Sequence, residues 1–228
     1  MLEVIAVTPE EARIAEGAGA GRIELVSALS EGGLTPGIGL AKRTVAAVRI
    51  PVNVMIRPHS RGFRYSFDEI EVMKEEIRAV RSAGANGVVL GVLDGNGAVD
   101  VRSLEALLAT AEGLEVTFHR AIDAAADPVA AARTLSRFPA VRTILTSGGP
   151  GRIEDHLPVL VRMREAAGHV RIMPGGGLTL ENAPRIARET GLRDFHVGTT
   201  VRKGRAVDGE LDPARLAELA ALLASIQR

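Results

Sequence analysis

Charged side chains at the ends of apolar segments are the first candidates for chemistry in this sequence. Glu24 and Arg57 lie at or near the carboxyl ends of two segments rich in valine, leucine and isoleucine. On adjacent strands they would form an ion pair, because a buried charge without a partner is costly. Such a pair has two interpretations. It is purely structural, or Arg57 holds a substrate carboxylate or phosphate while Glu24 orients it or moves a proton.

A histidine ends a third apolar segment. His119 and Arg120 are its last residues, and Asp123 follows three positions later. A histidine in such a place is either a packed core residue or a general acid or base. The predicted catalytic group is Glu24, Arg57, His119 and Asp123. Either Glu24 or His119 would transfer the proton, and Asp123 would act as an orienting residue.

Glycine clusters follow the last three apolar segments, at Thr146–Gly149, Pro174–Thr179 and Gly198–Thr200. Bare backbone amides after the late strands of a barrel, next to a helix N-terminus, commonly bind phosphate. The alternative is that these glycines only permit tight turns. The predicted anion-binding residues are Arg120, Ser147, Gly148, Gly175, Gly176, Gly177, Gly198 and Thr199.

The elements that would position these residues alternate along the whole chain. Stretches with apolar residues three and four apart, typical of amphipathic helices, separate eight apolar segments. Strands joined by helices run parallel, and eight such units in 228 residues predict a single-domain (β/α)₈ TIM barrel over residues 1–228. A doubly wound open sheet is less favoured, because the turn Val7–Glu10 lacks its glycine fingerprint. The predicted strands are Leu2–Val7, Arg22–Val26, Val52–Arg57, Val88–Val92, Glu115–Arg120, Arg142–Thr146, Val170–Met173 and Asp194–Val197.

The strand pattern also predicts which side chains face the barrel interior. Alternate residues of a strand point to opposite faces, so outward-facing Ile23 and Leu25 leave Arg22 and Glu24 inside. The same parity gives an interior that contains charge, and places the mouth residues at the carboxyl ends of the strands. The predicted interior residues are Glu3, Glu24, Arg57 and His119, with His196 as a further candidate.

Composition excludes several classes of function. The chain has 28 Lys+Arg and 28 Asp+Glu, so nothing favours nucleic acid or an anionic membrane as a partner. It has no cysteine, which excludes disulfides and thiolate chemistry. None of its three lysines lies in an apolar run, which disfavours an imine mechanism. No histidine and carboxylate spacing matches a helical zinc site, so no metal ligands are predicted. A cytoplasmic location is expected.

Several motifs resemble one known family. They are Arg22–Leu25, Glu31–Pro36, Ile56–Pro58, Gly91–Asp94, Val116–Asp123 and Leu145–Gly148, in this order along the chain. Together they are similar to the CutC copper homeostasis family. The resemblance implies a (β/α)₈ barrel, a cytoplasmic location, self-association and a copper role.

Copper is implied by this resemblance alone. Relatives for which copper binding has been suggested carry cysteines near the ends of the early strands, where this chain has Ile5, Ala6 and Val26. Cu(I) prefers thiolate or thioether donors, so any copper would have to be held weakly by methionine and histidine. The need for a cofactor therefore stays open.

Two functions remain open from the sequence. The chain is a copper-handling protein by descent, or it is an enzyme acting on a small anionic metabolite, phosphorylated or not, by general acid–base chemistry. Self-association is a further expectation, since Pro213–Ile226 carries more leucine than one buried stripe needs. Those leucines could equally pack against the barrel.

Overall fold

Eight strands alternate with eight α-helices in the computed structural model, which describes residues 1–226. The strands are β1 Leu2–Ala6, β2 Arg22–Leu25, β3 Val52–Met55, β4 Gly87–Leu90, β5 Glu115–Phe118, β6 Val141–Thr146, β7 Arg171–Pro174 and β8 Phe195–Val197. The helices are α1 Pro9–Gly17, α2 Ile38–Val45, α3 Phe67–Ser82, α4 Val101–Thr110, α5 Pro128–Leu135, α6 Leu157–Ala166, α7 Ala183–Thr190 and α8 Pro213–Ile226. Short 3₁₀ turns are η1 Leu29–Glu31, η2 Arg120–Ala124, η3 Ile153–His156, η4 Thr199–Val201 and η5 Lys203–Arg205.

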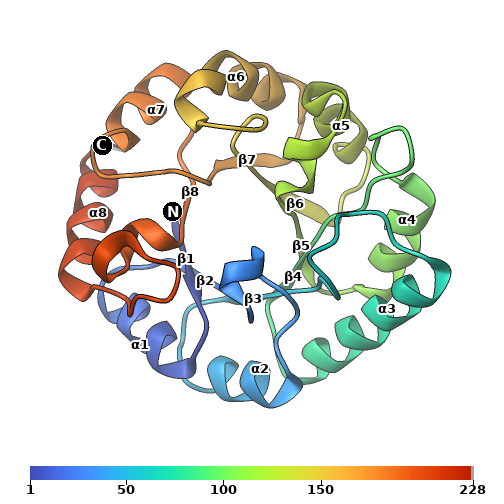
Figure 1. Ribbon diagram of the computed structural model, residues 1–228, viewed down its shortest axis with the longest axis horizontal. Coiled ribbons are helices and arrows are strands. Elements are labelled where there is room, and N and C mark those ends of the chain that lie inside the picture. Colours follow the sequence, from blue (N-terminus) through green and yellow to red (C-terminus); the bar gives the residue numbers. More distant parts are fainter. Residues whose placement is uncertain (227–228) are drawn as a thin grey trace.

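The strands form one parallel sheet that curls into a ring, with the helices outside it (Figure 1). The order is β7-β6-β5-β4-β3-β2-β1-β8, so the first strand pairs with both the second and the last. The predicted (β/α)₈ barrel is therefore confirmed. Its closure differs from the expectation, because β7 and β8 are neighbours in the ring without being paired by backbone hydrogen bonds.

Several helices, among them α1, α3 and α5, begin at side chains that accept otherwise unpaired backbone N–H groups. Thr8 Oγ1 accepts from the Glu11 amide before α1, and Asp127 caps α5 through two amides. Ser66 and Glu69 form a reciprocal capping box at α3. Each such cap contributes about 1 kcal/mol and fixes where the preceding loop ends. No helix within residues 1–226 combines the length and apolar character that crossing a bilayer requires.

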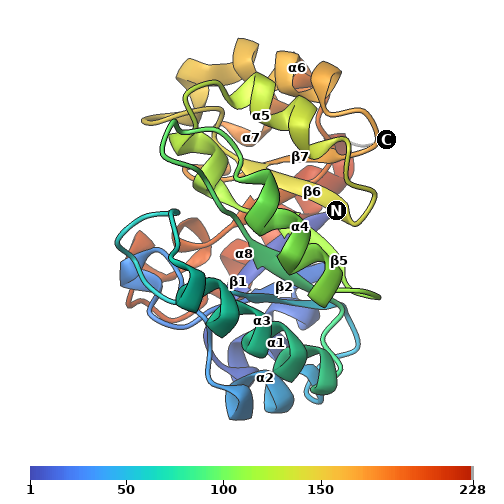
Figure 2. The same ribbon diagram turned by 90° about the vertical axis from the view of Figure 1, so that its right-hand side faces the viewer.

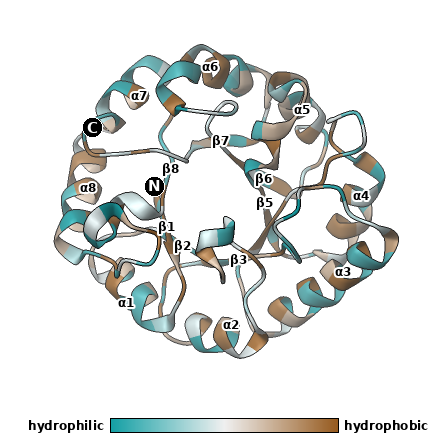
Figure 3. Ribbon diagram, viewed as in Figure 1, coloured by the Kyte–Doolittle hydropathy of each residue, from teal (hydrophilic) through white to brown (hydrophobic). Residues whose placement is uncertain are grey.

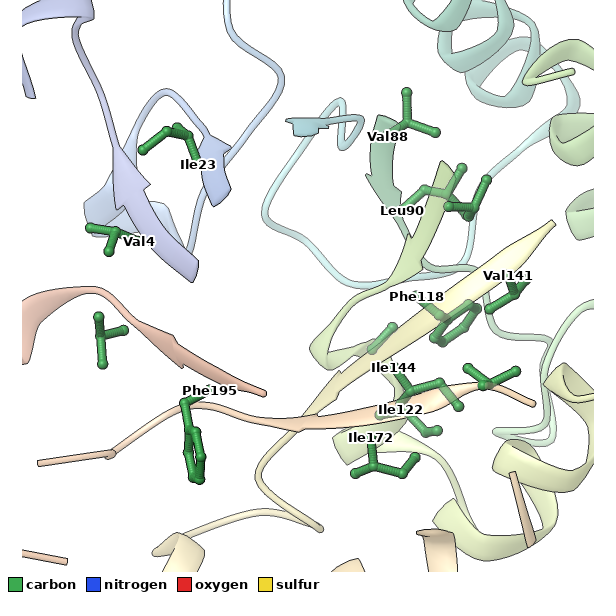
Figure 4. Packing of buried hydrophobic residues seen from close by; sticks show 14 of the residues in the cluster. Val4, Ile23, Val88, Leu90, Phe118, Ile122, Val141, Ile144, Ile172 and Phe195 are labelled. Carbon is green, nitrogen blue, oxygen red and sulfur yellow. The ribbon is translucent and has the colours of Figure 1, made fainter. Parts of the chain in front are cut away.

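The core lies mainly between the sheet and the helix ring. Outward-facing strand residues such as Val4, Ile23 and Phe118 are fully or almost fully buried there (Figure 4). Figure 3 shows brown along the strands and mixed teal and brown on the helices, and Figure 2 shows helices on both sides of the strands. A smaller apolar cluster of Val26, Met55 and Val89 faces the barrel interior. The alternation predicted from the sequence thus separates the two faces.

The leucines of α8 are used within the chain. Leu216, Leu219 and Leu223 are buried, and Leu222 and Ile226 are partly buried against the same core. None of the large exposed hydrophobic residues recorded in residues 1–226 belongs to α8. The leucine content of this helix is therefore accounted for by packing, and self-association stays a prediction.

Candidate functional site

A cavity of about 210 Å³ lies at the carboxyl ends of the strands. We call it the mouth pocket. The segment between β2 and α2, which includes Leu29 and Gly32, contributes to its wall and lies over the ring in Figure 1. Its polar lining is Glu24, Arg57, His119, Arg120, His196, Thr199 and Thr200, and its apolar lining includes Ile5, Leu29, Met55, Phe63, Leu145 and Leu178. The pocket is smaller than the 300–1,000 Å³ typical of ligand sites, which limits it to a small molecule.

Glu24 belongs to a buried ionic cluster formed by β1, β2 and β8. Arg22 Nε donates to Glu3 Oε2, and His196 Nδ1 lies 2.7 Å from Glu3 Oε1. His196 Nε2 lies 3.8 Å from Glu24 Oε2. All four residues are at most 4% exposed. Because β1 lies between β2 and β8, closing the ring brings residues from both ends of the sequence together.

The prediction of an ion pair between Glu24 and Arg57 is wrong. The Arg57 guanidinium turns toward the loops instead, where Nη1 donates to the carbonyls of Glu31 and Gly33 and Nη2 to that of Ser60. It also lies over the Phe63 ring, 5.0 Å from its centroid. Arg57 therefore anchors the loops that form the pocket wall, and of its nitrogens only Nε is buried without a partner among residues 1–226.

Glu24 is a buried carboxyl group with one oxygen that is unpartnered in the described part of the chain. It is 2% exposed, and its Oε1 has no partner among residues 1–226. Burial raises its pKa to about 7; Glu3 adds to the rise, while His196 and Arg22 oppose it. A carboxyl group in this state can release or take up a proton near neutral pH.

His119 is held as a neutral hydrogen-bond donor. Its Nδ1 accepts the Ala121 amide at 3.1 Å, which leaves the ring hydrogen on Nε2. Nε2 has no partner in the described part of the chain, although His119 lines the pocket. Burial, helped by the positive charge of Arg57, lowers the pKa of His119 to about 3. At neutral pH this ring can donate from Nε2 but has little capacity to take up a proton.

Gly91 makes room for that ring. A Cβ atom there would lie 2.5 Å from His119 Nδ1 and 2.8 Å from the Ala121 side chain. We expect Gly91→Ala to displace His119 and to lower the unfolding free energy by about 1–3 kcal/mol. Urea denaturation measures this, with Gly17→Ala as the control, because nothing lies within 4 Å of a Cβ at Gly17. Equal stabilities for the two variants would contradict the close contact.

Asp123 orients Arg120 rather than His119. Arg120 Nε donates to Asp123 Oδ2 at 2.8 Å, and Arg120 Nη2 donates to Ser147 Oγ at 3.0 Å. Asp123 also accepts from the Ser147 amide and from Thr146 Oγ1. His119 takes no part in these hydrogen bonds. They hold a half-exposed guanidinium at the rim of the pocket, against the Gly176 backbone.

Three of the predicted anion-binding amides are already occupied. The Ser147 amide donates to Asp123, that of Gly148 to Thr146 Oγ1, and that of Gly175 to the Thr146 carbonyl. Neither these residues nor Asp123 belong to the lining of the mouth pocket. Their amides stabilise the turns after β6 and β7, so the structure does not direct them at a ligand.

The other predicted glycine positions do line the pocket. Gly176, Gly177, Gly198 and Thr199 are part of its wall, and no hydrogen bond from their amides is recorded within residues 1–226. Gly176 and Gly177 have φ values of 80° and 101°, which a side chain would strain. Together with Arg120 they form the part of the pocket best suited to an anion.

Sequence reasoning gave His196 no role in the site, and it placed Glu3 only in the interior. Strand parity was the available signal for both, but their pairing depends on β1 lying beside β8. Phe63 was missed as a lining residue because it lies on a loop, whose course no periodicity predicts.

A (β/α)₈ barrel with an ionic pocket at the carboxyl ends of its strands is the class of protein that the fold and the site define. The model of the CutC family matches residues 1–201, and the chain belongs to the CutC family. The human copper homeostasis protein cutC homolog is 45% identical over 197 residues, which are 86% of this chain and 72% of that protein.

Solved structures agree with the fold. A CutC protein of Streptococcus agalactiae superposes with a TM-score of 0.81 at 30% identity, covering 87% of this chain and 97% of that one. Phosphoribosylanthranilate isomerase of Thermotoga maritima gives a TM-score of 0.68 at 17% identity, covering 98% of each chain. The second likeness shows the barrel fold alone.

The donor atoms of the mouth pocket do not fit Cu(I). The chain has no cysteine, and Met55 is the one methionine among the lining residues. The sulfur of Met173 lies 3.7 Å from Arg22 Nη2, beside a positive charge. Cu(I) prefers soft sulfur donors, and Met55 is the single sulfur donor that this pocket offers.

Proposed function

We propose that this protein is an enzyme that binds a small anionic, phosphorylated metabolite in the mouth pocket and transfers a proton with Glu24. The observation that carries the proposal is Glu24 itself, a buried carboxyl group whose Oε1 receives no hydrogen bond from residues 1–226, in a cavity that His119 and Arg120 also line. A buried carboxyl group without hydrogen bonds costs stability, and such a cost is characteristic of functional sites.

The rim of the pocket would bind the anionic group. The guanidinium of Arg120 is oriented by Asp123 and Ser147 before any ligand arrives, and the amides of Gly176, Gly177 and Gly198 lie in the same wall. Charge-assisted hydrogen bonds from an oriented guanidinium and from backbone amides suit the several oxygens of a phosphate group.

Glu24 and His119 would then have different roles. Glu24, with a pKa of about 7, would remove a proton from the ligand, and the neutral Nε2–H of His119 would donate to the oxygen on which negative charge develops. A carboxylate base combined with a neutral imidazole donor suits proton abstraction from a carbon next to a carbonyl group. Of the two bases left open by the sequence, this favours Glu24.

The copper role that the relatives' names carry is the second candidate. It has the family relationship in its favour, but no set of sulfur donors in the pocket supports it. We therefore propose acid–base chemistry on an anionic ligand as the function of this site.

Ligand-induced stabilisation tests the anion site. We expect at least one compound in a panel of inorganic phosphate and three- to six-carbon sugar phosphates to raise the melting temperature. Arg120→Met should weaken its binding by about tenfold or more, because a charged hydrogen bond contributes about 1.5–3 kcal/mol. Arg78→Met, on the exposed face of α3, is the matched control. A shift that Arg120→Met leaves unchanged, or no shift with any compound, would refute the anion site.

A further inference from the structure

The ionic cluster of Glu3, Arg22, Glu24 and His196 becomes electrically neutral when it binds one proton. Arg22 and Glu3 form a buried ion pair and cancel each other. Glu115 Oε2 also lies 3.8 Å from Arg22 Nη1, but the Glu115 side chain is 43% exposed, so solvent screens its charge. Glu24 and a neutral His196 would then leave one negative charge that no other basic side chain of residues 1–226 cancels within salt-bridge distance. A buried uncompensated charge is unfavourable, and one proton bound to either group makes the whole cluster neutral.

The hydrogen bonds of the cluster fix how His196 faces Glu24. Arg22 holds Glu3, and Glu3 Oε1 accepts from His196 Nδ1 at 2.7 Å. The Nδ1 hydrogen is therefore donated to Glu3, and in the neutral ring the lone pair is on Nε2. Nε2 lies 3.8 Å from Glu24 Oε2. Both His196 and Glu24 line the mouth pocket, so a proton between them is within reach of a bound ligand.

We propose that Glu24 and His196 hold one exchangeable proton between them in the wall of the mouth pocket, and that Glu3 is a positioning residue that keeps His196 Nε2 free to accept it. The step is a transfer from the carboxylic acid of Glu24 to Nε2, which leaves a carboxylate and an imidazolium ion. No other atom or electron moves. The titratable and charged groups that face His196 are Glu3 and Arg22 besides Glu24.

A metal ion fits the same atoms less well. Ligand atoms of Glu3, Glu24 and His196 lie within 4.8 Å of one another, which is a spacing that a metal can bridge. Both oxygens of Glu3 already accept hydrogen bonds, however, so two side chains remain, whereas zinc sites commonly use three or four. A divalent ion would also give the cluster a net positive charge, where a proton gives none.

The electrostatics of the pair agree with the geometry. Burial opposes the charge on His196, but Glu24 and Glu3 outweigh it and raise its pKa above the usual value. Burial raises the pKa of Glu24 as well. Two groups whose proton affinities are both raised by their shared site titrate as a pair.

The shared proton does not depend on the proposed function, but the role that we give it in a reaction rests on that function. After Glu24 has removed a proton from the ligand, His196 would take that proton, so that Glu24 returns to the carboxylate form while the ligand is still bound. The pocket would then have two acid–base groups rather than one, which suits a reaction that moves a proton between neighbouring positions of the ligand.

Nitrogen NMR of the histidine rings in the full-length, metal-free protein tests the pair. We expect His196 Nδ1 to stay protonated from pH 5 to 9, while Nε2 titrates with a midpoint above the usual value for histidine. Glu24→Gln should lower this midpoint by about one to three pH units, because it removes the nearby negative charge. Glu3→Gln should lower it too and release the fixed tautomer. His119, which should not titrate in this range, is an internal control.

Three results would overturn the pair. They are a midpoint unchanged by Glu24→Gln, a hydrogen on Nε2 with Nδ1 free at neutral pH, and a stoichiometric change in the Nε2 signal on addition of zinc. If Glu3→Gln does not fold, the Glu24→Gln titration still decides. If a phosphate ester binds but His196 does not titrate together with Glu24, the shared proton is refuted and the proposed function is not. If the two groups titrate together but no compound of the phosphate panel binds, the proposed function is refuted and the shared proton is not.

Discussion

Replacing Arg22 with methionine should lower the unfolding free energy by about 3–5 kcal/mol. Glu3 is completely buried and, although burial opposes its ionisation, Arg22 and His196 hold its pKa below the usual value. Without Arg22, a carboxylate in the centre of the barrel loses its main counter-charge, and breaking one side of a buried ion pair has a cost of this size. Urea denaturation at neutral pH measures the loss.

The matched variants separate the lost charge from lost packing. The double variant Arg22→Met with Glu3→Gln should recover a large part of the stability, because no uncompensated charge remains. Arg171→Met removes an arginine that is about half exposed and should change the stability little. A loss below about 1 kcal/mol for Arg22→Met alone would show that the ion pair is not buried as described.

Glu24→Gln should stabilise the protein at alkaline pH by about 3 kcal/mol. The folded pKa of Glu24 is about 7, against an ordinary value of 4.5 for a glutamate side chain in water. A carboxyl group whose pKa is raised on folding favours the folded state below pH 4.5, and that contribution is lost as the pH rises through 7. The difference corresponds to about 3 kcal/mol, which glutamine removes because it cannot ionise.

Melting temperatures at pH 5 and pH 8.5 measure this effect. The advantage of Glu24→Gln should be several degrees at pH 8.5 and should shrink toward pH 5. Glu105→Gln, at an exposed position of α4, should behave like the unmodified protein at both values. If Glu24→Gln and the unmodified protein have the same melting temperature at pH 8.5, burial does not raise the pKa of Glu24 as described above.

The barrel could be predicted because its signals are local and repeated. Each strand is a short apolar run, and each run is followed by a segment of helical periodicity. Parity within those runs also placed Glu3, Glu24 and His119 on the interior face, where the structure has them. Such predictions need only the pleat of a strand, which every strand shares.

The partners of these residues could not be predicted in the same way. Arg57 follows β3, and its long side chain donates to carbonyl groups of the loops. The register of the strands does not determine the direction in which this side chain extends. The contact between Glu3 and His196 joins positions 193 residues apart and arises from the pairing of β1 with β8. Which glycine amides are occupied likewise depends on side chains such as Asp123 and Thr146 that fold back onto the turns.

Exchange of hydrogen between solvent and ligand tests most directly whether Glu24 moves a proton in the mouth pocket. The protein is incubated in D₂O with the phosphorylated hydroxy-carbonyl compounds that raise its melting temperature, and deuterium is located by NMR. We predict deuterium at a carbon next to the carbonyl group of one compound, at a rate that rises with pH through about 7 and falls at least a hundredfold in Glu24→Gln. Binding without exchange, or exchange at the same rate in Glu24→Gln, would contradict this account.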